Sequence, residues 1–551
     1  MSCWNIAEAI YQLAESDYGN QPALIHAGEV QTYAELKQRA SGIASHLQSL
    51  GLPAGAHVGH YLRNSNAYME VFTGVGLAGM AHVNVNYRYR DEELVDLCNG
   101  LDIRVLVYDA EFADIVARIH PQLTETLAFI EVDAAAVAGR RGDGKTANSF
   151  AMPLSLLQHA ETCKFQRQTS SDDLVLIATG GTTGLPKGTQ WRHEDMWRKM
   201  QVSTSNALKM VLGVETHPDT LEEHVANVNK LGRGMPFLSL SPLMHGAGLM
   251  MALLMMSQGN ALVTLDGVKF DPDATLDAIK QSGVGGMVLV GDAFAMPLIE
   301  ALDRRSEEQT IASLMMLVSS GASLSDNSKA ALLKHNPKLI LFDTLGSSEA
   351  SGYGLSTPEA GVFNPMPTTR VLDENLQDVV PGSDTIGMAY SGGYMPIGYY
   401  KEPQKSAETF VEIDGVRYVM TGDRCTVRED GKLVLLGRDS TVINTGGEKV
   451  YTVEVERVLI DHPAITDALV IGLPHPRFGK QVVAVVEGPA LTESNLDVAD
   501  IQSHAGQHLA DYKIPKLIFA IEDLQRAPNG KPDYPFINTY AEQQLASSST
   551  T

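Results

Sequence analysis

The sequence predicts an α/β protein with a large N-terminal domain, built from layered α/β subdomains and a β-rich subdomain, and a small α+β C-terminal domain. Three observations predict this fold class. The chain has 551 residues, which is too many for a single hydrophobic core. Segments with helical spacing of apolar residues alternate with short apolar segments typical of buried strands. Several of those apolar segments end in Gly or Asp, which favours strands that lead into loops.

The expected elements follow in chain order. A helix is expected over residues 33–52, whose apolar residues recur at helical spacing until a stop signal at Gly51. Strands are expected over the short apolar segments 57–62, 103–109, 127–133, 174–178, 285–291 and 338–346. Such alternation favours layers with mostly parallel sheets. Ligands of such sheets bind where the carboxyl ends of the strands meet loops.

Two polar stretches are interpreted as insertions or linkers. Residues 136–150 are polar and rich in Gly. Residues 213–234 are acidic and are interpreted as a helical insertion that lies over a site. The most suggestive domain boundary lies in residues 435–450. Residues 415–437 before it have a strand–turn–strand pattern, and residues 453–474 after it read as a helix and then a strand.

We therefore predict three parts of the chain. They are an N-terminal domain of residues 1–437, a hinge of residues 438–443 and a C-terminal domain of residues 444–551.

Composition and charge exclude several classes of partner. Hydrophobic residues make up 44% of the chain and charged residues 20%, an ordinary globular balance. The formal net charge of −24 argues against a nucleic-acid backbone or an anionic membrane as the main partner. The longest apolar run, Leu249–Met256, is too short for an integral membrane segment, and the N-terminus does not resemble a signal peptide. We expect a cytoplasmic protein, because the cysteines are scattered without metal or disulfide spacing: Cys3, Cys98, Cys163 and Cys425.

The segment "TGGTTGLPKGT", residues 179–189, is the strongest local signal for a ligand. Its glycines allow close backbone approach, its N–H groups can form a concave nest for an anion, and Lys187 adds a positive charge. An apolar strand candidate, residues 174–178, directly precedes it. This arrangement predicts a phosphate-binding loop, although it does not fit the Walker pattern, because Pro186 precedes Lys187 and Gly188 follows it.

Further motifs follow in a fixed order and give this loop its context. They are "PLMHGAG" (242–248), "SSGASLS" (319–325), "DTLGSSEA" (343–350), "TGDR" (421–424), "GRDSTVINTGGEKV" (437–450) and "PNGKPD" (528–533). Together with the loop they resemble the motifs of the adenylate-forming superfamily of acyl-CoA synthetases, luciferases and adenylation domains. The resemblance covers nearly the whole chain.

The resemblance implies a two-step reaction with ATP, Mg²⁺ and coenzyme A. A carboxylate attacks the α-phosphate of MgATP to give an acyl adenylate and pyrophosphate. A thiol, usually that of coenzyme A, then attacks the acyl carbon and expels AMP. The protein contributes mainly positioning and charge neutralisation. The resemblance also implies that the small C-terminal domain is mobile and rotates between the two steps.

Each site residue is expected from its motif. Lys531 is implied as the catalytic cation of the adenylation step, and His245 as the residue that borders the acid and gates access for coenzyme A. Thr183 and Glu349 are implied to act in catalysis as ligands of Mg²⁺. The residues implied to hold the nucleotide phosphates are Thr179, Gly180, Gly181, Thr182, Thr183, Gly184 and Lys187.

The remaining implied ligands of the nucleotide and of coenzyme A come from the later motifs. Asp423 is implied to bind the ribose hydroxyls, with Arg438 as a further ribose or phosphate contact, and Ser348 to reach the α-phosphate. Those implied around the adenine or the α-phosphate are Gly321, Ala322, Ser323, Asp343, Gly346, Ser347 and Ser348. Those implied along the pantetheine arm are Gly446, Gly447 and Glu448.

The acid itself is only narrowed to a class. The glycine loop followed by "QWRHED" (190–195), the insertion at 213–234 and "GSSEA" (346–350) resemble bacterial ligases for very-long-chain, steroid or terpenoid acids. Small residues at 246–248 and nearby methionines suit a wide apolar pocket, with ordinary core packing as the alternative. We expect a hydrophobic acid of fatty, isoprenoid or steroid type. Open alternatives are a ligase that loads a carrier protein, an aryl-acid ligase and a non-catalytic nucleotide- or acyl-binding protein. A homodimer is also left open.

Overall fold

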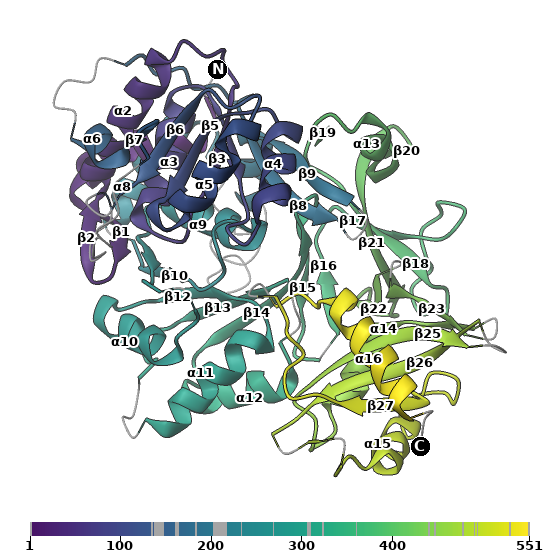
Figure 1. The fold of residues 1–551 in the computed structure, drawn as a ribbon. Helices are drawn as coiled ribbons and strands as arrows, with labels where there is room; N and C mark the ends of the chain where they lie inside the picture. The colour runs from purple at the N-terminus through teal and green to yellow at the C-terminus, as the bar shows by residue number, and fades with distance from the viewer. Residues whose placement is uncertain are drawn as a thin grey trace. The chain divides into compact units, whose positions relative to one another are not determined.

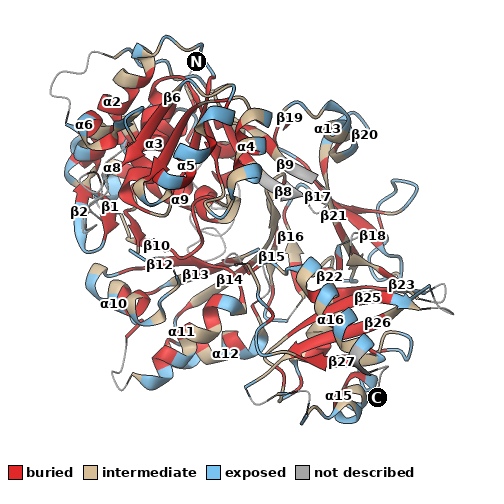
Figure 2. Cartoon of the chain, in the orientation of Figure 1, coloured by how far each residue is buried: buried red, intermediate tan, exposed pale blue. Residues whose placement is uncertain are grey.

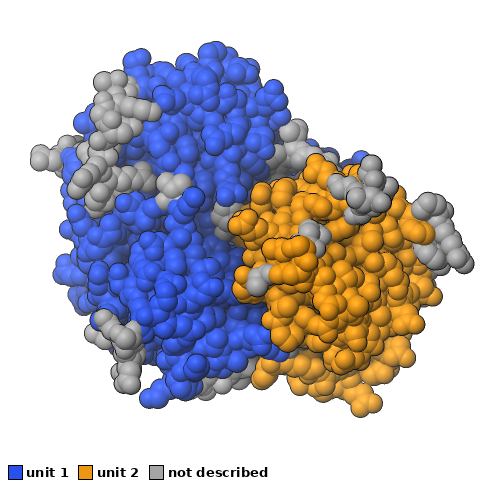
Figure 3. Space-filling model, turned by 60° about the horizontal axis from the view of Figure 1, so that its bottom comes forward, with its two compact units in different colours: residues 1–352, 392–419 blue, residues 353–391, 420–551 orange. Residues whose placement is uncertain are grey.

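The computed structural model describes residues 3–133, 136, 148–159, 165–181, 184–201, 218–232, 234–267, 269–305, 310–321, 324–359, 361–438, 441–445, 448–475, 479–489, 491–492, 494–527 and 530–548. The chain divides into two compact units, which Figure 3 colours separately. Unit 1 comprises Met1–Gly352 and Gly392–Val419, and unit 2 comprises Tyr353–Ser391 and Met420–Thr551. The predicted boundary at residues 438–443 and the domains on either side of it stay predictions.

One sheet of unit 1 has eight strands in the order β19-β9-β8-β4-β3-β5-β6-β7 (Figure 1). The strands from β7 to β8 run parallel, whereas β8, β9 and β19 pair in antiparallel fashion. Their bounds are β3 His57–Tyr61, β4 Ala81–Asn84, β5 Ile103–Asp109, β6 Ala128–Val132, β7 Ala151–Pro153, β8 Leu174–Gly181, β9 Gly184–Arg192 and β19 Gly398–Tyr399.

The other strands of unit 1 follow the order β14-β13-β12-β10-β11-β1-β2. From β14 to β1 they pair in parallel, and β2 returns antiparallel to β1. Their bounds are β1 Pro22–His26, β2 Glu29–Thr32, β10 Phe237–Ser239, β11 Leu262–Thr264, β12 Gly286–Leu289, β13 Met316–Ser320 and β14 Ile340–Ser347. The predicted strands therefore form, and the α/β class with parallel sheets is confirmed.

Helices cover both sheets of unit 1. The expected helix of residues 33–52 forms as α2, Tyr33–Ser49, and begins at a capping box in which Thr32 and Glu35 bond each other's backbone N–H groups. The other α-helices with defined bounds are α1 Ile6–Glu15, α3 Asn66–Leu77, α4 Asp91–Gly100, α5 Ala113–Ile119, α6 Leu154–Gln158, α8 Leu221–Leu231, α9 Gly246–Ser257, α10 Pro272–Ser282, α11 Asp292–Arg304, α12 Asp326–His335 and α13 Pro403–Thr409. Residues 193–201 form a further helix. Short 3-10 turns lie at Asp17–Asn20, Ala110–Phe112 and His120–Gln122.

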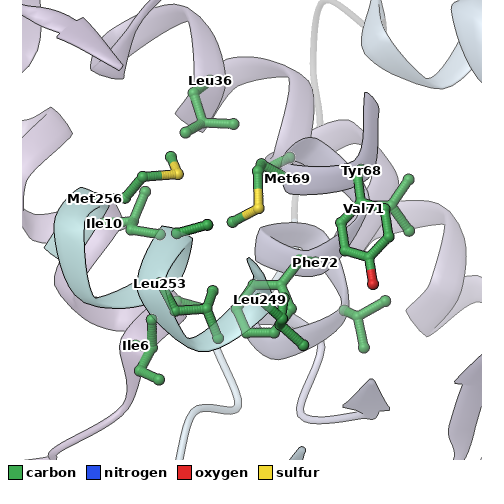
Figure 4. Close-up of a cluster of buried hydrophobic side chains, with 14 of the residues drawn as sticks. Ile6, Ile10, Leu36, Tyr68, Met69, Val71, Phe72, Leu249, Leu253 and Met256 are labelled. Carbon is green, nitrogen blue, oxygen red and sulfur yellow. The ribbon is translucent and has the colours of Figure 1, made fainter. Parts of the chain in front are cut away.

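The apolar helix α9 packs into the core of unit 1. Figure 2 shows that β3 and β12 are buried, and Figure 4 shows Leu249, Leu253 and Met256 of α9 packed among side chains of α1 and α3. A Cβ at Gly248 would lie 2.5 Å from the carbonyl oxygen of Pro242, so this glycine allows the helix to approach backbone closely. The small residue at 248 is therefore explained by packing, and it does not enlarge a pocket.

Unit 2 contains a β-rich part and an α+β module. The β-rich part follows the order β17-β18-β21-β22-β16-β15. Its strands are β15 Ser351–Ser356, β16 Val362–Pro365, β17 Thr369–Leu372, β18 Gly387–Ser391, β21 Val416–Val427 and β22 Leu433–Arg438. The first residues of β15 and β21 belong to unit 1, where β20, Phe410–Ile413, pairs with residues 416–419 of β21.

The α+β module has a five-stranded sheet covered by three helices. Its strands are β23 Ile443–Thr445, β24 Glu448–Val450, β25 Asp467–His475, β26 Gly479–Glu487 and β27 Leu517–Ala520, and its helices are α14 Thr452–Ile460, α15 Val498–Gly506 and α16 Tyr534–Ser548. Two apolar clusters of the module have members alternating along β25 and β26. In the described part of the chain, no helix is long and apolar enough to cross a membrane.

Candidate functional site

The predicted phosphate loop is a β-hairpin in the structure. Strand β8 continues to Gly181 and β9 begins at Gly184, with Thr179 opposite Lys187 in the antiparallel register. The segment predicted as a loop therefore pairs as strand on both sides of the turn, because glycine backbone can still pair in a ladder. The predicted ligands Thr182 and Thr183 lie outside the described residues.

The lysine of this hairpin lies in a cationic group of side chains. Lys187 is partly buried, and its Nζ is 5.5 Å from the centre of the Tyr399 ring. Burial lowers the pKa of Lys187, and the adjacent ammonium of Lys405 on α13 lowers it further, while the nearby Glu402 and Glu349 oppose the shift. Two neighbouring ammonium groups repel each other, so an anion placed beside them is stabilised.

Glu349 lies in a tight turn that follows β14. Gly346 is required there, because a Cβ at this position would lie 2.5 Å from the carbonyl oxygen of Ser351. The Ser347 hydroxyl accepts hydrogen bonds from the backbone N–H groups of Glu349, at 3.3 Å, and Ala350, at 3.1 Å. These bonds fix the direction in which the Glu349 side chain leaves the turn.

Two side chains from the eight-stranded sheet contact this turn. The Tyr399 hydroxyl donates a hydrogen bond of 2.8 Å to Oε1 of Glu349. The Trp191 indole Nε1 donates a hydrogen bond of 2.8 Å to the carbonyl oxygen of Ser348. Trp191 and Tyr399 thus bring Glu349 together with Lys187. The sequence motifs predicted that Glu349 and Lys187 lie at one site.

The segment of the predicted gating histidine lies beside the same turn. His245 is the N-cap residue of α9, and a Cβ at the next residue, Gly246, would lie 3.4 Å from the Ser348 hydroxyl oxygen. The buried Asn84, at the end of β4, ties this segment to the phosphate hairpin. Its Oδ1 accepts a hydrogen bond of 2.6 Å from the backbone N–H of Ala178. Its Nδ2 donates one of 3.3 Å to the carbonyl oxygen of Ala178 and another to the carbonyl oxygen of Met244.

The predicted adenine segments meet at the ends of two neighbouring parallel strands. Ser319 and Ser320 of β13 lie opposite Asp343 and Thr344 of β14, so Gly321 directly follows its strand beside these residues. Burial raises the pKa of Asp343 to about 7, and its carboxylate accepts a hydrogen bond of 3.4 Å from the backbone N–H of Leu324. The other two predicted residues of this segment, Ala322 and Ser323, lie outside the described residues.

Unit 2 contains a second carboxylate site. Asp423 on β21 is 5% exposed and lies opposite Arg438 of β22 in the register. Its Oδ1 accepts a hydrogen bond of 3.2 Å from Arg438 Nε, and its Oδ2 accepts one from the hydroxyl of the buried Tyr353. The structure therefore brings together the two predicted ribose contacts, Asp423 and Arg438.

The predicted catalytic lysine also lies in unit 2. Lys531 is exposed, and its carbonyl oxygen accepts a hydrogen bond of 2.9 Å from Ala527 N. This turn is braced by Arg526, which bonds the Gly530 carbonyl oxygen at 3.2 Å and makes a two-pronged ion pair with Asp467. Glu448 is exposed at the start of β24, whereas Gly446 and Gly447 lie outside the described residues.

Five residues of these sites were missed by the sequence reasoning. Each is distant in sequence from the group it contacts, and only the packing of strands brings them together: Asn84, Trp191, Tyr353, Tyr399 and Lys405. The "QWRHED" and "GYYKEPQK" segments held Trp191, Tyr399 and Lys405. No spacing in one sequence links a tyrosine to a carboxylate 50 residues away, or a tryptophan to a backbone carbonyl oxygen 157 residues away.

The chemistry of unit 1 suits a polyphosphate with a divalent cation. Carboxylate oxygens such as those of Glu349 are the ligand type that Mg²⁺ prefers. Among the described residues, no group of three or more His, Cys, Asp or Glu side chains could hold a metal alone. Mg²⁺ usually binds through one or two carboxylates and the phosphates of its nucleotide, so the residues present fit this ion.

Comparisons with known proteins agree over the whole chain. Residues 12–400 match the model of the AMP-binding enzyme family, and residues 454–531 match that of the AMP-binding enzyme C-terminal domain. The medium/long-chain-fatty-acid–CoA/3-oxocholest-4-en-26-oate–CoA ligase of Mycobacterium marinum is 35% identical, with 98% of each chain covered. The 3-oxocholest-4-en-26-oate–CoA ligase of Rhodococcus rhodochrous is 33% identical over 93% of this chain and 91% of its own length.

A solved structure supports the fold independently. An anthranilate CoA ligase in complex with anthranoyl-AMP superposes with a TM-score of 0.82 at 21% identity, with 99% of each chain covered. Together with the matched family models and the full-length relatives, the two-unit fold leads to one conclusion: this chain belongs to the AMP-binding enzyme family.

Proposed function

We propose that this protein is an ATP-dependent acid–CoA ligase that converts a hydrophobic carboxylic acid to its CoA thioester through an acyl adenylate. The observation that carries the proposal is the cluster in unit 1, where Glu349 and Lys187 both contact Tyr399 and Lys405 lies beside Lys187. The two ammonium groups match a polyphosphate, the Glu349 carboxylate matches its Mg²⁺, and Glu402 is a second carboxylate near Lys187. Relatives with this activity in their names share about a third of the sequence over nearly the full chain.

In the first step, an oxygen of the substrate carboxylate attacks the α-phosphorus of ATP, and the bond to pyrophosphate breaks. Lys187 and the hairpin N–H groups hold the departing phosphates, and Ser348 donates to an α-phosphate oxygen. Glu349 holds Mg²⁺, which neutralises part of the phosphate charge when it is bound. Lys531 supplies a further positive charge where negative charge accumulates.

In the second step, the sulfur of coenzyme A attacks the acyl carbon, the bond to AMP breaks, and the thiol proton is released. His245 is the N-cap residue of α9 and borders the acid in this proposal. Asp423 and Arg438 hold the ribose, and Glu448 with the adjoining glycines 446 and 447 lies along the pantetheine arm. The small domain turns about residues 438–443 between the steps, so that one pocket serves both.

The acid class proposed is fatty, isoprenoid or steroid-type. The names of the relatives support the fatty and steroid types, because they include medium/long-chain fatty acids and 3-oxocholest-4-en-26-oate. We further propose that the enzyme acts in the cytoplasm, and a homodimer is the assembly to be tested. Cell fractionation and light scattering of the purified protein test these two statements.

The deciding experiment is pyrophosphate release with MgATP against octanoate, palmitate, a branched isoprenoid acid, a steroid acid and benzoate, with and without CoA. Lys531→Ala serves as the inactive control. CoA-dependent turnover of an apolar acid supports the proposal. Turnover restricted to benzoate would replace it with an aryl-acid ligase, and adenylate formation that ignores CoA would point to a carrier protein as the acceptor. Absence of acid-dependent release from folded protein would overturn it in favour of a binding protein.

A further inference from the structure

Two paired strands at the edge of the eight-stranded sheet contact the turn of Glu349. Tyr399 on β19 lies opposite Thr189 on β9, and Trp191 is two residues further along β9. Lys187, the cation of the phosphate hairpin, belongs to the same strand, four residues before Trp191. The strand that carries the phosphate-binding cation is therefore also the strand from which the carboxylate turn is held.

The contact made by Trp191 involves its one polar atom. The side chain is fully buried, and its Nε1 donates a 2.8 Å hydrogen bond to the carbonyl oxygen of Ser348, the residue just before Glu349. A buried indole N–H without an acceptor is unfavourable, so the position of the turn and the position of the strand are coupled. A phenylalanine would keep an aromatic ring at this site and remove the coupling.

The contact made by Tyr399 acts on the carboxylate itself. The side chain is 9% exposed, and its hydroxyl donates a 2.8 Å hydrogen bond to Oε1 of Glu349. Because this bond engages one oxygen, the carboxylate has a fixed orientation and Oε2 is directed elsewhere. A tyrosine hydroxyl is protonated at neutral pH and can donate to a carboxylate.

We infer that Trp191 and Tyr399 are positioning residues that set the distance between the Glu349 carboxylate and the Lys187 strand, and thereby the affinity of the enzyme for ATP as its magnesium complex. This inference rests on the proposed function, since it assigns the ligand of the same site. A magnesium nucleotide needs its metal-binding oxygen and its phosphate-binding cation at one separation. The two hydrogen bonds hold that separation before the ligand arrives, which lowers the cost of binding.

The chain offers a matched control for each residue. Tyr400 is the next residue, and its hydroxyl makes an equivalent 2.8 Å hydrogen bond to the carboxylate of Asp102, outside the proposed site. Trp197 is a second buried tryptophan, whose Nε1 has no hydrogen-bond partner among the residues that the structure describes. Trp197→Phe therefore shrinks a buried ring without removing a hydrogen bond.

The test compares Tyr399→Phe and Trp191→Phe with Tyr400→Phe and Trp197→Phe. Calorimetric titration measures the Kd for ATP with Mg²⁺ and again with EDTA, and kinetic assays measure the Mg²⁺ concentration for half-maximal pyrophosphate release. Because hydrogen bonds to charged groups exceed neutral ones in strength, we expect Tyr399→Phe to raise the Kd for MgATP about tenfold and Trp191→Phe about fivefold. In EDTA, the Kd of these two variants for ATP should stay within about twofold of the wild-type value. The two control variants should keep the wild-type Kd for MgATP within about twofold.

The inference would be overturned if Tyr399→Phe left the magnesium dependence within twofold, or if the control variants shifted it equally. Equal weakening with Mg²⁺ and with EDTA would also overturn it, since the residues would then act only on the fold. Should Trp191→Phe not fold, the Tyr399→Phe and Tyr400→Phe pair decides. Wild-type protein that binds MgATP but turns over no acid would count against the proposed function alone, because the binding comparison would still be made.

Discussion

Unit 1 and unit 2 each hold one carboxylate with a tyrosine hydroxyl, and they hold it differently. In unit 1, Glu349 is partly buried, and its carboxylate accepts a hydrogen bond from Tyr399 on one oxygen. In unit 2, Asp423 is nearly fully buried, and Tyr353 and Arg438 engage its two oxygens separately. The first carboxylate is oriented but keeps bonding capacity, whereas the second already has a hydrogen-bond donor on each oxygen.

This difference shows what each carboxylate is suited to bind. A metal ion needs oxygen lone pairs that are not already engaged. The Glu349 carboxylate, with a hydrogen bond from Tyr399 on Oε1, keeps more of them than the Asp423 carboxylate does. The guanidinium of Arg438 shares the charge of Asp423, so this carboxylate is suited to accept hydrogen bonds from neutral hydroxyls. The same functional group, a carboxylate, in two environments therefore supports the roles proposed for cation binding in unit 1 and ribose binding in unit 2.

The largest effect that this comparison predicts is at Glu349. Glu349→Gln keeps the size of the side chain but removes the negative charge, and we expect kcat/KM for MgATP to fall about 10²-fold or more. The melting temperature without ligand should change little, because the side chain is partly exposed. Glu402→Gln is the control, since this carboxylate also lies near Lys187. A loss below threefold, or an equal loss in the control, would remove the distinction between the two carboxylates.

The next largest effect concerns a single step of the reaction. Lys531→Ala should lower acid-dependent pyrophosphate release about 10²-fold, because the positive charge is needed where phosphate charge builds up. Formation of the thioester from supplied acyl adenylate and CoA should stay near the wild-type rate. Lys516→Ala removes another exposed lysine of the same module and should leave both steps unchanged. Equal loss in both steps would assign Lys531 a general role in the fold.

Sequence patterns predicted elements and motifs, but not the contacts between them. The helix from Tyr33 and the strand ending near Asp109 follow from periodicity and caps, which are local properties. The roles of Lys187 and Glu349 followed from motif resemblance, and packing brings both to Tyr399. The hairpin ladder at Thr179 was not anticipated, because pairing partners can override the low strand preference of glycine.

Contacts such as that of Trp191 depend on which strand lies next to which turn. That arrangement is set by the whole sheet and leaves no spacing in the sequence. The methionine-rich helix α9 is a second example, because a buried core helix and a pocket wall share one composition and only packing separates them.

A smaller effect is expected on the stability of unit 2. Asp423→Ala leaves the buried Tyr353 hydroxyl without its acceptor, which costs about 1–3 kcal/mol of unfolding free energy. Asp423→Asn retains an acceptor oxygen and should cost less, while both variants should weaken ATP binding. Chemical denaturation of the two variants, with Tyr353→Phe as a third, measures the difference. Equal stability of the Ala and Asn variants would mean that the tyrosine contact does not stabilise this carboxylate.

The smallest effect is expected at Lys405, and it separates a phosphate-binding cation from a surface charge. Lys405→Met should raise the KM for MgATP about threefold, less than Lys187→Met, because no residue of α13 is buried and solvent screens the charge of Lys405. The same variant should slightly raise the melting temperature without ligand, because it relieves the repulsion between two ammonium groups. Lys401→Met, which breaks a 2.7 Å ion pair with Asp102, should leave the KM unchanged. A higher melting temperature together with a higher KM for MgATP would show that the repulsion between the two lysines lowers stability and that their paired charge binds the anion. Neither change alone distinguishes a role in binding from a role in packing.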